Sequence, residues 1–454
     1  MTYIRFGGKQ ILLECGLYQD SSYLESYKIN SKKFPFNPEE IDYVFLGHEH
    51  IDHIGLLPKL VNEGFKGIII TTKESVAIIK HLLLNCAFIL LEESNILSKR
   101  YNRDYKPIYT EEDVCRTLPL IKAYDEYHTI YQLDNIVSFQ WLKNSHCVGA
   151  AQLQLILNNG LKTKKILYTS DIGALHSQNH YVYDTEIPSM FNDITIMEST
   201  YGLKSRMTKK TRKFDVEHLR VAVNTVLDRY GTLVLPAFSF SRTQELLTVL
   251  YLLFGNIPDF NTEIIVDSML SCDICDDYCT ILTDDHANLW RQVYNWKNVK
   301  FVREKADSQL CIADHTPKIC ISSSGFCTNG RILHYLNKYL RDENSMIIFS
   351  GYTGNSDSYL SYRIKNGKTH KTININKQPV PNRADCMCMS TFSSHANFDD
   401  LVTYGSSLHT NKLILCHGNT EAKNCLKEAL INQISKNDKS YKVICSEKGM
   451  IINL

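Results

Sequence analysis

The segment with the most evident chemistry is 48–53, which reads HEHIDH and places three histidines and an aspartate within six residues. Residues two apart in an extended segment point to the same side, so His48 and His50 can hold one metal ion. We expect Asp52 and His53, where the chain turns into a helix, to face a second ion nearby. Nitrogen and carboxylate ligands without thiolates suit a catalytic zinc ion with an open coordination position.

Four further polar residues follow predicted strands and are candidates for the remaining ligands: His146, Asp171, His395 and His417. A polar side chain in a loop directly after an apolar strand is a common active-site position in α/β folds. Each of these residues alone is more often structural or exposed than a ligand. Their value as candidates depends on the segment 48–53.

The elements that must position these residues alternate between strand-like and helical patterns, which is typical of an α/β fold. The predicted strands are 10–14, 42–46, 66–72, 166–169, 194–197, 232–235, 263–266, 318–321, 346–349 and 412–416. A helix is predicted over 71–91. Because the character of the sequence changes near 200 and near 370, we expect a second α/β domain between these points.

Length and composition restrict the class of protein. With 454 residues, 44% of them hydrophobic, and a net charge of +1, the chain is typical of a soluble globular protein with several domains. Its 15 cysteines are an odd number at scattered spacings, so we expect reduced thiols and a cytoplasmic location. The longest apolar stretch, 82–91, is about half of a membrane span. It therefore predicts a buried helix and no membrane association.

Residues 43–60, YVFLGHEHIDHIGLLPKL, resemble the signature of the metallo-β-lactamase superfamily. Segments 198–202 (ESTYG), 392–396 (FSSHA) and 417–418 (HG) resemble motifs A, B and C of its β-CASP branch, which contains nucleases that process RNA or DNA. The chain most resembles the RNA-cleaving group. That group includes the endonuclease subunit of the cleavage and polyadenylation specificity factor and its bacterial and archaeal relatives. The resemblance covers nearly the whole chain.

The resemblance implies an α/β fold in which 1–199 and 370–454 form an αββα sandwich and 200–369 form an inserted α/β β-CASP domain. It also implies two zinc ions between the sheets of the sandwich. The ligands that it implies are His48, His50 and His146 for the first ion, Asp52, His53 and His417 for the second, and Asp171 as a bridge between both.

The same resemblance implies hydrolysis of phosphodiester bonds in RNA by a two-metal mechanism, with endonuclease favoured over exonuclease action. Asp52 would take part through its zinc ion. His395, oriented by Glu198, would protonate the leaving 3′ oxygen, because a carboxylate keeps a neighbouring imidazole protonated and aimed. Three alternatives stay open: a DNA nuclease of the same branch, a hydrolase of a small ester, and a non-catalytic RNA-binding scaffold. The long insert argues against the ester hydrolase, and seven filled ligand positions argue against the scaffold.

Segment 204–213 contains six basic and no acidic residues. Without it the chain has 44 basic and 49 acidic residues, a net charge of −5 rather than +1. We expect Lys204, Arg206, Lys209 and Lys210 to steer the phosphates of single-stranded RNA. A solvated helix start would give the same pattern.

A second set of predicted RNA contacts lies in the middle domain. Ser324 and Gly325 belong to a polar turn after a strand, where hydroxyls and backbone N–H groups can bind phosphate. Arg331 follows in a predicted helix and is expected to face the same cleft. The predicted partner is single-stranded RNA, and a homodimer is compatible with the sequence.

Departures from the family pattern are few. Glu14 stands where the family usually has Asp, and the extra methylene is expected to shift the ligands that it supports from behind. Asn419 replaces the usual Glu after His417-Gly. Segment 1–16 corresponds to the family's second and third strands, and the usual first strand with its Gly-rich loop is not evident. We therefore expect either a truncated start or a rebuilt sheet edge. Cysteines at 272, 275 and 279 predict ordinary thiols on a helix face rather than a structural metal site.

Overall fold

The computed structural model describes residues 1–19, 22–208, 211–351, 353–354, 356–367, 369–436 and 440–453. The chain divides into two compact units. Unit 1 consists of Met1–Thr208 and Ser394–Leu454, and unit 2 consists of Lys209–Ser393. The sequence of unit 1 is thus interrupted by that of unit 2.

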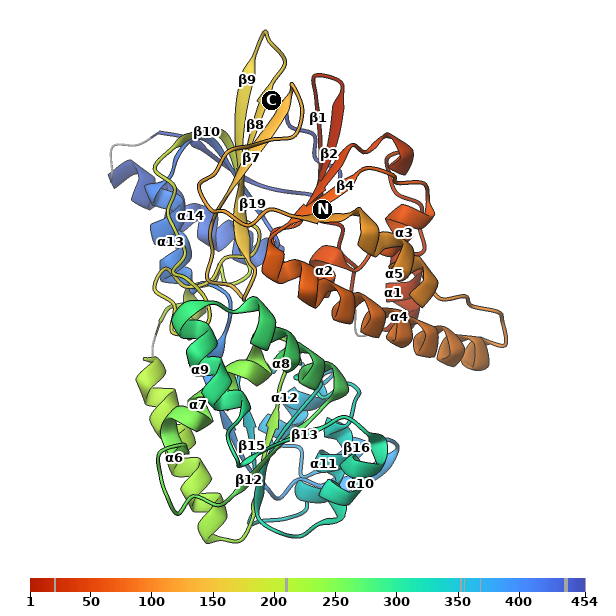
Figure 1. Ribbon diagram of the computed structural model, residues 1–454, viewed down its shortest axis with the longest axis vertical. Coiled ribbons are helices and arrows are strands. Elements are labelled where there is room, and N and C mark those ends of the chain that lie inside the picture. Colours follow the sequence, from red (N-terminus) through yellow and green to blue (C-terminus); the bar gives the residue numbers. More distant parts are fainter. Residues whose placement is uncertain are drawn as a thin grey trace. The chain divides into compact units, whose positions relative to one another are not determined.

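Two β-sheets form the middle of unit 1 (Figure 1). The five-stranded sheet contains, in spatial order, β1 (Thr2–Phe6), β2 (Lys9–Leu13), β3 (Tyr43–Phe45), β4 (Ile68–Thr71) and β5 (Ile121–Ala123). The seven-stranded sheet contains, in spatial order, β20 (Lys442–Cys445), β19 (His409–Cys416), β10 (Phe191–Glu198), β9 (Thr163–Tyr168), β8 (Ala151–Asn158), β7 (Val137–Lys143) and β6 (Tyr131–Gln132).

The two sheets face each other across an apolar core. Phe45 of β3 packs in one buried cluster with Trp141 of β7 and Ile196 of β10. The next residue of β10, Met197, lies in a different buried cluster together with Leu430 of the helix behind the sheet. Since neighbouring residues of a strand point to opposite faces, β10 is apolar on both sides, which accounts for its continuous run of apolar residues.

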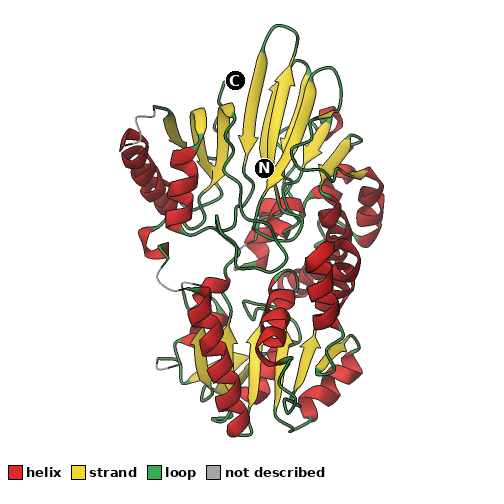
Figure 2. Cartoon of the chain, turned by 60° about the vertical axis from the view of Figure 1, so that its left-hand side comes forward, coloured by secondary structure: helices red, strands yellow, loops and turns green. Residues whose placement is uncertain are grey.

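Helices cover the outer faces of both sheets, which gives the αββα sandwich that the resemblance implied (Figure 2). Those beside the five-stranded sheet are α1 (Tyr23–Asn30), α2 (Ile51–Ile54), α3 (Leu57–Asn62), α4 (Lys73–Tyr101) and α5 (Glu111–Thr117). Those beside the seven-stranded sheet are α13 (Phe398–Ser407) and α14 (Thr420–Lys436).

Helix α4 begins where the sequence predicted and continues ten residues beyond the predicted end at 91. Among the described residues it is the one helix long and apolar enough, by length and composition, to cross a membrane, and 44% of its most apolar window is buried inside unit 1. Ile79, Leu83 and Leu90 lie on its buried side, whereas Phe88 and Leu91 are exposed. The predicted buried helix is therefore only partly buried, and core contacts account for part of its apolar composition.

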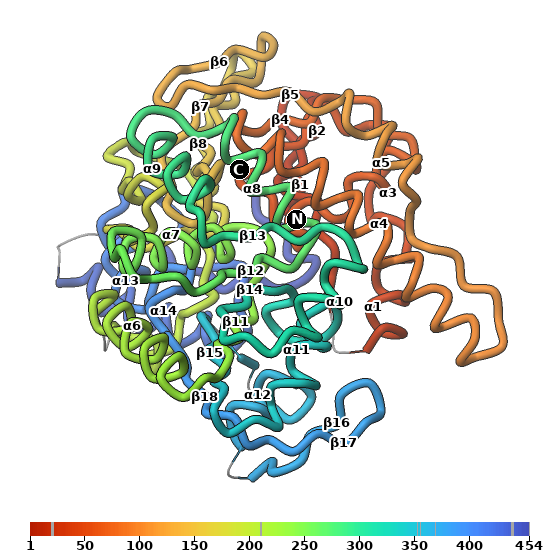
Figure 3. The backbone as a smooth tube through the Cα atoms, turned by 60° about the horizontal axis from the view of Figure 1, so that its bottom comes forward, coloured from red at the N-terminus to blue at the C-terminus, as the bar shows by residue number. Residues whose placement is uncertain are grey.

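Unit 2 is built on a six-stranded parallel sheet with helices on both faces (Figures 1 and 2). Its strands are, in spatial order, β13 (Val299–Val302), β12 (Glu263–Asp267), β14 (Lys318–Ser322), β11 (Thr232–Pro236), β15 (Met346–Phe349) and β18 (Asp385–Cys388). Its helices are α6 (Arg212–Asp228), α7 (Arg242–Phe254), α8 (Met269–Ile281), α9 (Asp284–Tyr294), α10 (Lys305–Ala313), α11 (Ile332–Tyr339) and α12 (Leu360–Lys365). A hairpin of β16 (Thr372–Ile375) and β17 (Gln378–Pro381) lies at its edge beside α11 (Figure 3).

The boundaries of the insert differ from the predicted 200 and 369. Thr208 still belongs to unit 1, where its backbone N–H and its hydroxyl donate to Asp399. At the other end, β18 pairs in parallel with β15, so the chain stays in unit 2 until Ser393. Alternating strand and helix patterns in the sequence do not show which distant strands pair. The prediction therefore placed the second boundary too early.

Candidate metal centre

The seven ligands that the resemblance implied lie where strands of unit 1 end, whereas the further candidate His395 follows the helix η4 (Ser390–Phe392) rather than a strand. His48 and His50 follow β3, and Asp52 and His53 lie in α2 directly after them. The remaining ligands follow the strands β7, β9 and β19: His146, Asp171 and His417. These three strands run in the same direction, so their carboxyl ends share one edge of the seven-stranded sheet. Sheet topology therefore joins residues that are distant in sequence.

The first group consists of His48, His50 and His146, whose ligand atoms lie close enough to share one cation. His146 Nε2 lies 3.2 Å from His50 Nδ1, and the ring of His48 lies 4.8 Å from the rings of both. Burial lowers the pKa of His48 and of His146 well below the usual range, and it lowers the pKa of His50 to about 4. Neutral imidazoles are the form that binds metal ions.

The second group consists of Asp52, His53 and His417. His53 Nε2 lies 3.3 Å from His417 Nε2, which in turn lies 3.4 Å from Asp52 Oδ2. Asp171 contacts this group through both oxygens: Oδ2 lies 3.3 Å from His53 Nε2, and Oδ1 lies 3.0 Å from His417 Nδ1. Although its burial opposes ionisation, the charges of His53 and His417 hold the pKa of Asp171 well below its usual range.

This donor set fits divalent metal ions. Two ligands of a tetrahedral zinc ion with Zn–N distances of about 2.0–2.1 Å are about 3.3 Å apart, which is the separation of the facing nitrogens in both groups. His48 Nε2 is buried without a hydrogen-bond partner. Such atoms are costly to bury unless a ligand satisfies them. The donors are imidazole and carboxylate, without thiolate, as zinc prefers in catalytic sites.

Glu14 supports both groups from behind, as the sequence predicted. Its Oε1 accepts the N–H of Gly47 at 2.9 Å and the hydroxyl of Ser170 at 3.1 Å, and it lies 3.6 Å from His53 Nδ1. The Ser170 oxygen also lies 2.9 Å from His48 Nδ1. Glu14 thus contacts His53 directly and reaches His48 through Ser170.

Sequence reasoning did not find the role of Ser170. Its φ of +52° is in the left-handed region, which aims the hydroxyl back toward His48 rather than along the strand. The available signal was its position directly before Asp171 at the end of β9. Thr200 was missed in the same way: its hydroxyl lies 3.0 Å from His417 Nδ1.

Glu198 and His395 meet beside the first group. His395 Nδ1 lies 3.3 Å from Glu198 Oε1, and its ring lies 4.7 Å from that of His146. Backbone N–H groups of Ile172 and Thr200 donate to the two oxygens of Glu198, at 2.7 and 3.2 Å. Burial alone would lower the pKa of His395, but the charge and hydrogen bond of Glu198 raise it to about 10. Contact with Glu198 therefore holds the ring in place and favours its protonated form.

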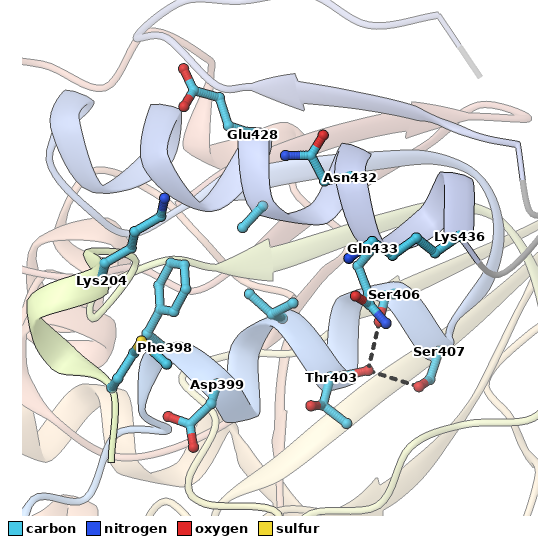
Figure 4. A pocket seen from close by; sticks show the side chains of 13 residues that line it. Lys204, Phe398, Asp399, Thr403, Ser406, Ser407, Glu428, Asn432, Gln433 and Lys436 are labelled. Carbon is cyan, nitrogen blue, oxygen red and sulfur yellow. Dashed lines mark hydrogen bonds between the residues drawn. The ribbon is translucent and has the colours of Figure 1, made fainter. Parts of the chain in front are cut away.

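The predicted RNA contacts of unit 1 lie in and after the helix η3 (Lys204–Arg206). Lys204 lines a groove of about 540 Å³ between α13 and α14, with Phe398 and Val402 of α13 (Figure 4). The Arg206 guanidinium lies 4.2 Å from the centre of the Tyr201 ring. Lys209 and Lys210 lie outside the described residues. The RNA-contact role of this segment stays a prediction.

The predicted contacts of unit 2 belong to a loop after β14. Ser324 Oγ accepts the N–H of Thr328 at 3.1 Å, which shapes the loop, and Gly325 packs against the ring of Phe238. Arg331 donates to buried Asp267 at 2.7 Å and to the carbonyl of Val302 at 3.1 Å. Its side chain is therefore engaged in joining strand ends, a structural role that the sequence did not reveal. RNA binding by these residues stays a prediction.

Two of the three cysteines of α8 are packing residues in the structure. Cys272 and Cys275 are buried, and burial raises the pKa of both thiols, whereas Cys279 is exposed. Among the described residues, every group of side chains close enough to hold a metal ion lies in unit 1 and contains no cysteine. The interpretation of these residues as ordinary thiols thus agrees with the structure.

Family comparisons agree with this fold and this donor set. The model of the metallo-beta-lactamase superfamily matches residues 1–114, and the model of the Beta-Casp domain matches residues 243–357. The chain therefore carries a metallo-beta-lactamase domain and a Beta-Casp domain. The first of these domains implies binding of divalent metal ions, for which the two groups provide ligands.

Known relatives cover almost all of the chain. It is 24% identical over 446 residues to Endoribonuclease YSH1 of Candida glabrata, covering 94% of this chain and 54% of the relative. It is 26% identical over 423 residues to Ribonuclease TTHA0252 of Thermus thermophilus, covering 91% and 89%. It is 26% identical over 440 residues to the Cleavage and polyadenylation specificity factor subunit 3-I of Arabidopsis thaliana, covering 95% and 59%. The chain thus spans about half the length of the Candida glabrata relative and 59% of the length of the Arabidopsis thaliana relative.

Proposed function

We propose that this protein is a zinc-dependent ribonuclease that hydrolyses phosphodiester bonds in single-stranded RNA. The observation that carries the proposal is the position of the Glu198–His395 pair, whose histidine ring lies 4.7 Å from the ring of His146 in the metal centre. A proton donor and a cation site side by side are what phosphodiester hydrolysis requires. Two relatives named as ribonucleases support RNA as the substrate.

We assign two zinc ions to the centre, one held by His48, His50 and His146 and the other by Asp52, His53 and His417. Asp171 lies beside ligands of both groups and would be shared. When bound, the ions would act as Lewis acids toward water and toward the phosphate. The first group supplies only neutral imidazoles, and the carboxylates belong to the second group. The ligands together therefore carry less negative charge than two zinc ions carry positive charge, so the ions stay electrophilic.

Delivery of a proton to the leaving group falls to His395. Glu198 holds Nδ1 of the ring, and backbone N–H groups of Ile172 and Thr200 hold Glu198 in turn. This leaves Nε2–H to protonate the departing 3′ oxygen of RNA. The side chain of His395 is 22% exposed, whereas that of Glu198 is 1% exposed. The imidazole ring can therefore contact the substrate while the carboxylate of Glu198 stays shielded from water.

Substrate binding is assigned to the four basic residues predicted in the segment 204–213, of which Lys204 and Arg206 lie in the described part of the chain and Lys209 and Lys210 outside it. Action within the RNA chain, rather than from an end, is favoured by the name endoribonuclease that the YSH1 relative carries. A cytoplasmic location is supported by the cysteines: all fifteen lie in the described part of the chain, and none forms a disulfide.

The test is incubation of the zinc-loaded protein with end-labelled single-stranded RNA and DNA of the same sequence. The matched control is the double variant Asp52→Ala, His53→Ala, which lacks two ligands of the second group. Internal RNA products that the control does not give support the proposal. Cleavage of DNA alone, or equal products with the double variant, would contradict it. Light scattering of the same preparation tests whether the chain forms a homodimer.

A further inference from the structure

Glu49 is a buried carboxyl group that the proposed chemistry does not use. It stands between His48 and His50 in the sequence and is 0% exposed. Because alternate residues of an extended segment point to opposite sides, its side chain extends away from the two neighbouring histidines. Its Oε2 accepts the hydroxyl of Ser75 at 2.9 Å, at the start of α4. Glu49 thus lies behind the first histidine group rather than in it.

This carboxyl group belongs to a small polar cluster, which consists of Glu49, Thr72, Ser75 and Gly149. The carbonyl oxygen of Gly149 lies 2.7 Å from the hydroxyl of Thr72 and 3.2 Å from that of Ser75. Gly149 has a φ of +88°, and a Cβ there would lie 2.6 Å from Ser75 Oγ and 3.3 Å from Glu49 Oε1. A side chain at this position would displace the cluster, so the close approach requires glycine.

The cluster joins the two loops that carry the first histidine group. Glu49 is bonded along the chain to His48 and His50, and Gly149 follows His146 by three residues in the other loop. Both loops are tied to the same hydroxyl of Ser75. His50 Nδ1 and His146 Nε2 lie 3.2 Å apart on one side of the two loops. On the opposite side, the hydroxyl of Ser75 links the same two loops.

A buried carboxyl group is an expensive way to fill this space. Glu49 Oε1 has no hydrogen-bond partner, so the burial of this oxygen is not compensated. An apolar side chain of similar volume would avoid that cost. Stability alone does not account for a carboxyl group here, whereas a requirement for a fixed contact to Ser75 does.

We propose that Glu49 is a positioning residue that fixes the spacing of the His48, His50 and His146 group for its divalent cation. The proposal rests on the metal-binding part of the proposed function and does not depend on RNA cleavage. Residues that orient ligands from behind typically change metal affinity about 10- to 100-fold when they are replaced. The effect should fall mainly on one of two binding steps, because Glu49 and Gly149 belong to the two loops that carry His48, His50 and His146.

The experiment is equilibrium dialysis of the metal-free protein against buffered zinc, with metal content measured at each concentration. Glu49→Leu, which keeps the volume and removes both oxygens, should weaken one binding step about 10- to 100-fold and leave the other unchanged. Glu49→Gln keeps the length and an acceptor for Ser75, and should restore the wild-type curve. The same pair loaded with cobalt(II) should show an altered visible spectrum in Glu49→Leu and a normal one in Glu49→Gln.

Glu74→Leu is the matched control, since it removes a carboxylate from the residue beside Ser75 and should leave both steps unchanged. Ser75→Ala removes the shared hydroxyl alone and should weaken the same step as Glu49→Leu, which keeps the proposal testable if Glu49→Leu does not fold. Wild-type binding in the folded Glu49→Leu or Ser75→Ala variant would overturn it. Equal losses in Glu49→Gln and Glu49→Leu would do so too, because charge rather than position would then be required. Zinc binding without RNA cleavage would count against the proposed function only.

Discussion

His395 Nδ1 lies 3.3 Å from Glu198 Oε1, although the two residues are 197 positions apart in the sequence. The contact is made because Glu198 ends β10 and His395 stands where the chain returns to unit 1. Both oxygens of Glu198 also accept hydrogen bonds from backbone N–H groups, so the carboxylate is held in place independently of His395. The pair is thus a fixed contact between a buried carboxylate and a partly exposed imidazole rather than a chance surface contact.

We expect His395→Ala to lower kcat for RNA cleavage about 10²–10⁴-fold, because a positioned general acid contributes that much. Glu198→Gln should lower it as well, since the neutral amide no longer keeps the imidazole protonated. Zinc content should stay at the wild-type value in both variants, as neither residue belongs to the two proposed ligand groups. The measurement is single-turnover cleavage beside metal analysis. His409→Ala, at an exposed histidine of β19, is the control, and equal rates in His395→Ala and His409→Ala would reject the role.

Glu14→Asp should lower zinc affinity about tenfold, because residues behind metal ligands typically have effects of this size. The shorter carboxylate would retreat from Ser170 and from His53 Nδ1, which Oε1 now reaches at 3.1 and 3.6 Å. Competition with a coloured chelator measures the change. Glu63→Asp, which shortens a carboxylate paired with Lys59 at 3.5 Å, provides the comparison. Wild-type affinity in Glu14→Asp would show that the longer side chain has no positioning role.

The sequence predicted the metal centre because its chemistry is concentrated in one short segment and at strand ends. Segment 48–53 places four donors together, and an apolar strand followed by a polar residue pointed to His146, Asp171 and His417. Ser170 and Thr200 could not be predicted, because a single hydroxyl carries no motif and its role depends on a left-handed φ or on a distant strand. These residues act through contacts that exist only after folding.

The fold class was predictable for the same reason, whereas its long-range pairings were not. Alternating strands and helices indicated an α/β fold in both parts of the chain. Arg331 lies in a polar segment that suggested RNA, but its partner Asp267 lies 64 positions earlier at the end of another strand. Only the parallel order of β12 and β14 brings the two together.

Asp267→Asn should destabilise unit 2 by about 3–5 kcal/mol, because it breaks one partner of a buried ion pair. Asp267 is fully buried and accepts from Arg331 at 2.7 Å, Tyr335 at 2.8 Å and Ser308 at 2.6 Å. Hydrogen exchange of the strands of unit 2 measures the loss. Asp273→Asn, whose pairing with Arg303 is longer at 3.5 Å and partly exposed, should cost less than about 1 kcal/mol. Similar losses in the two variants would show that burial of Asp267 is not decisive.

Asp134 should make unit 1 less stable in acid. Although its burial opposes the shift, backbone N–H groups of Ile136 and Val137, the ammonium of Lys9 and the hydroxyl of Tyr43 lower the pKa of Asp134 to about 2. A carboxyl whose folded pKa lies below its unfolded value of about 3.9 stabilises the fold above that value. This stability, about 2 kcal/mol, is lost as pH falls from about 4 to about 2.

Asp134→Asn should therefore lower the free energy of unfolding at pH 7 by about 2 kcal/mol and flatten its fall between about pH 4 and pH 2. Denaturant unfolding at a series of pH values measures both effects. Asp125→Asn, at an exposed position of the same unit, should keep the wild-type pH dependence. An unchanged fall in stability between about pH 4 and pH 2 in Asp134→Asn would show that titration of Asp134 does not contribute to it. A parallel downward shift at all pH values would assign the loss to packing instead.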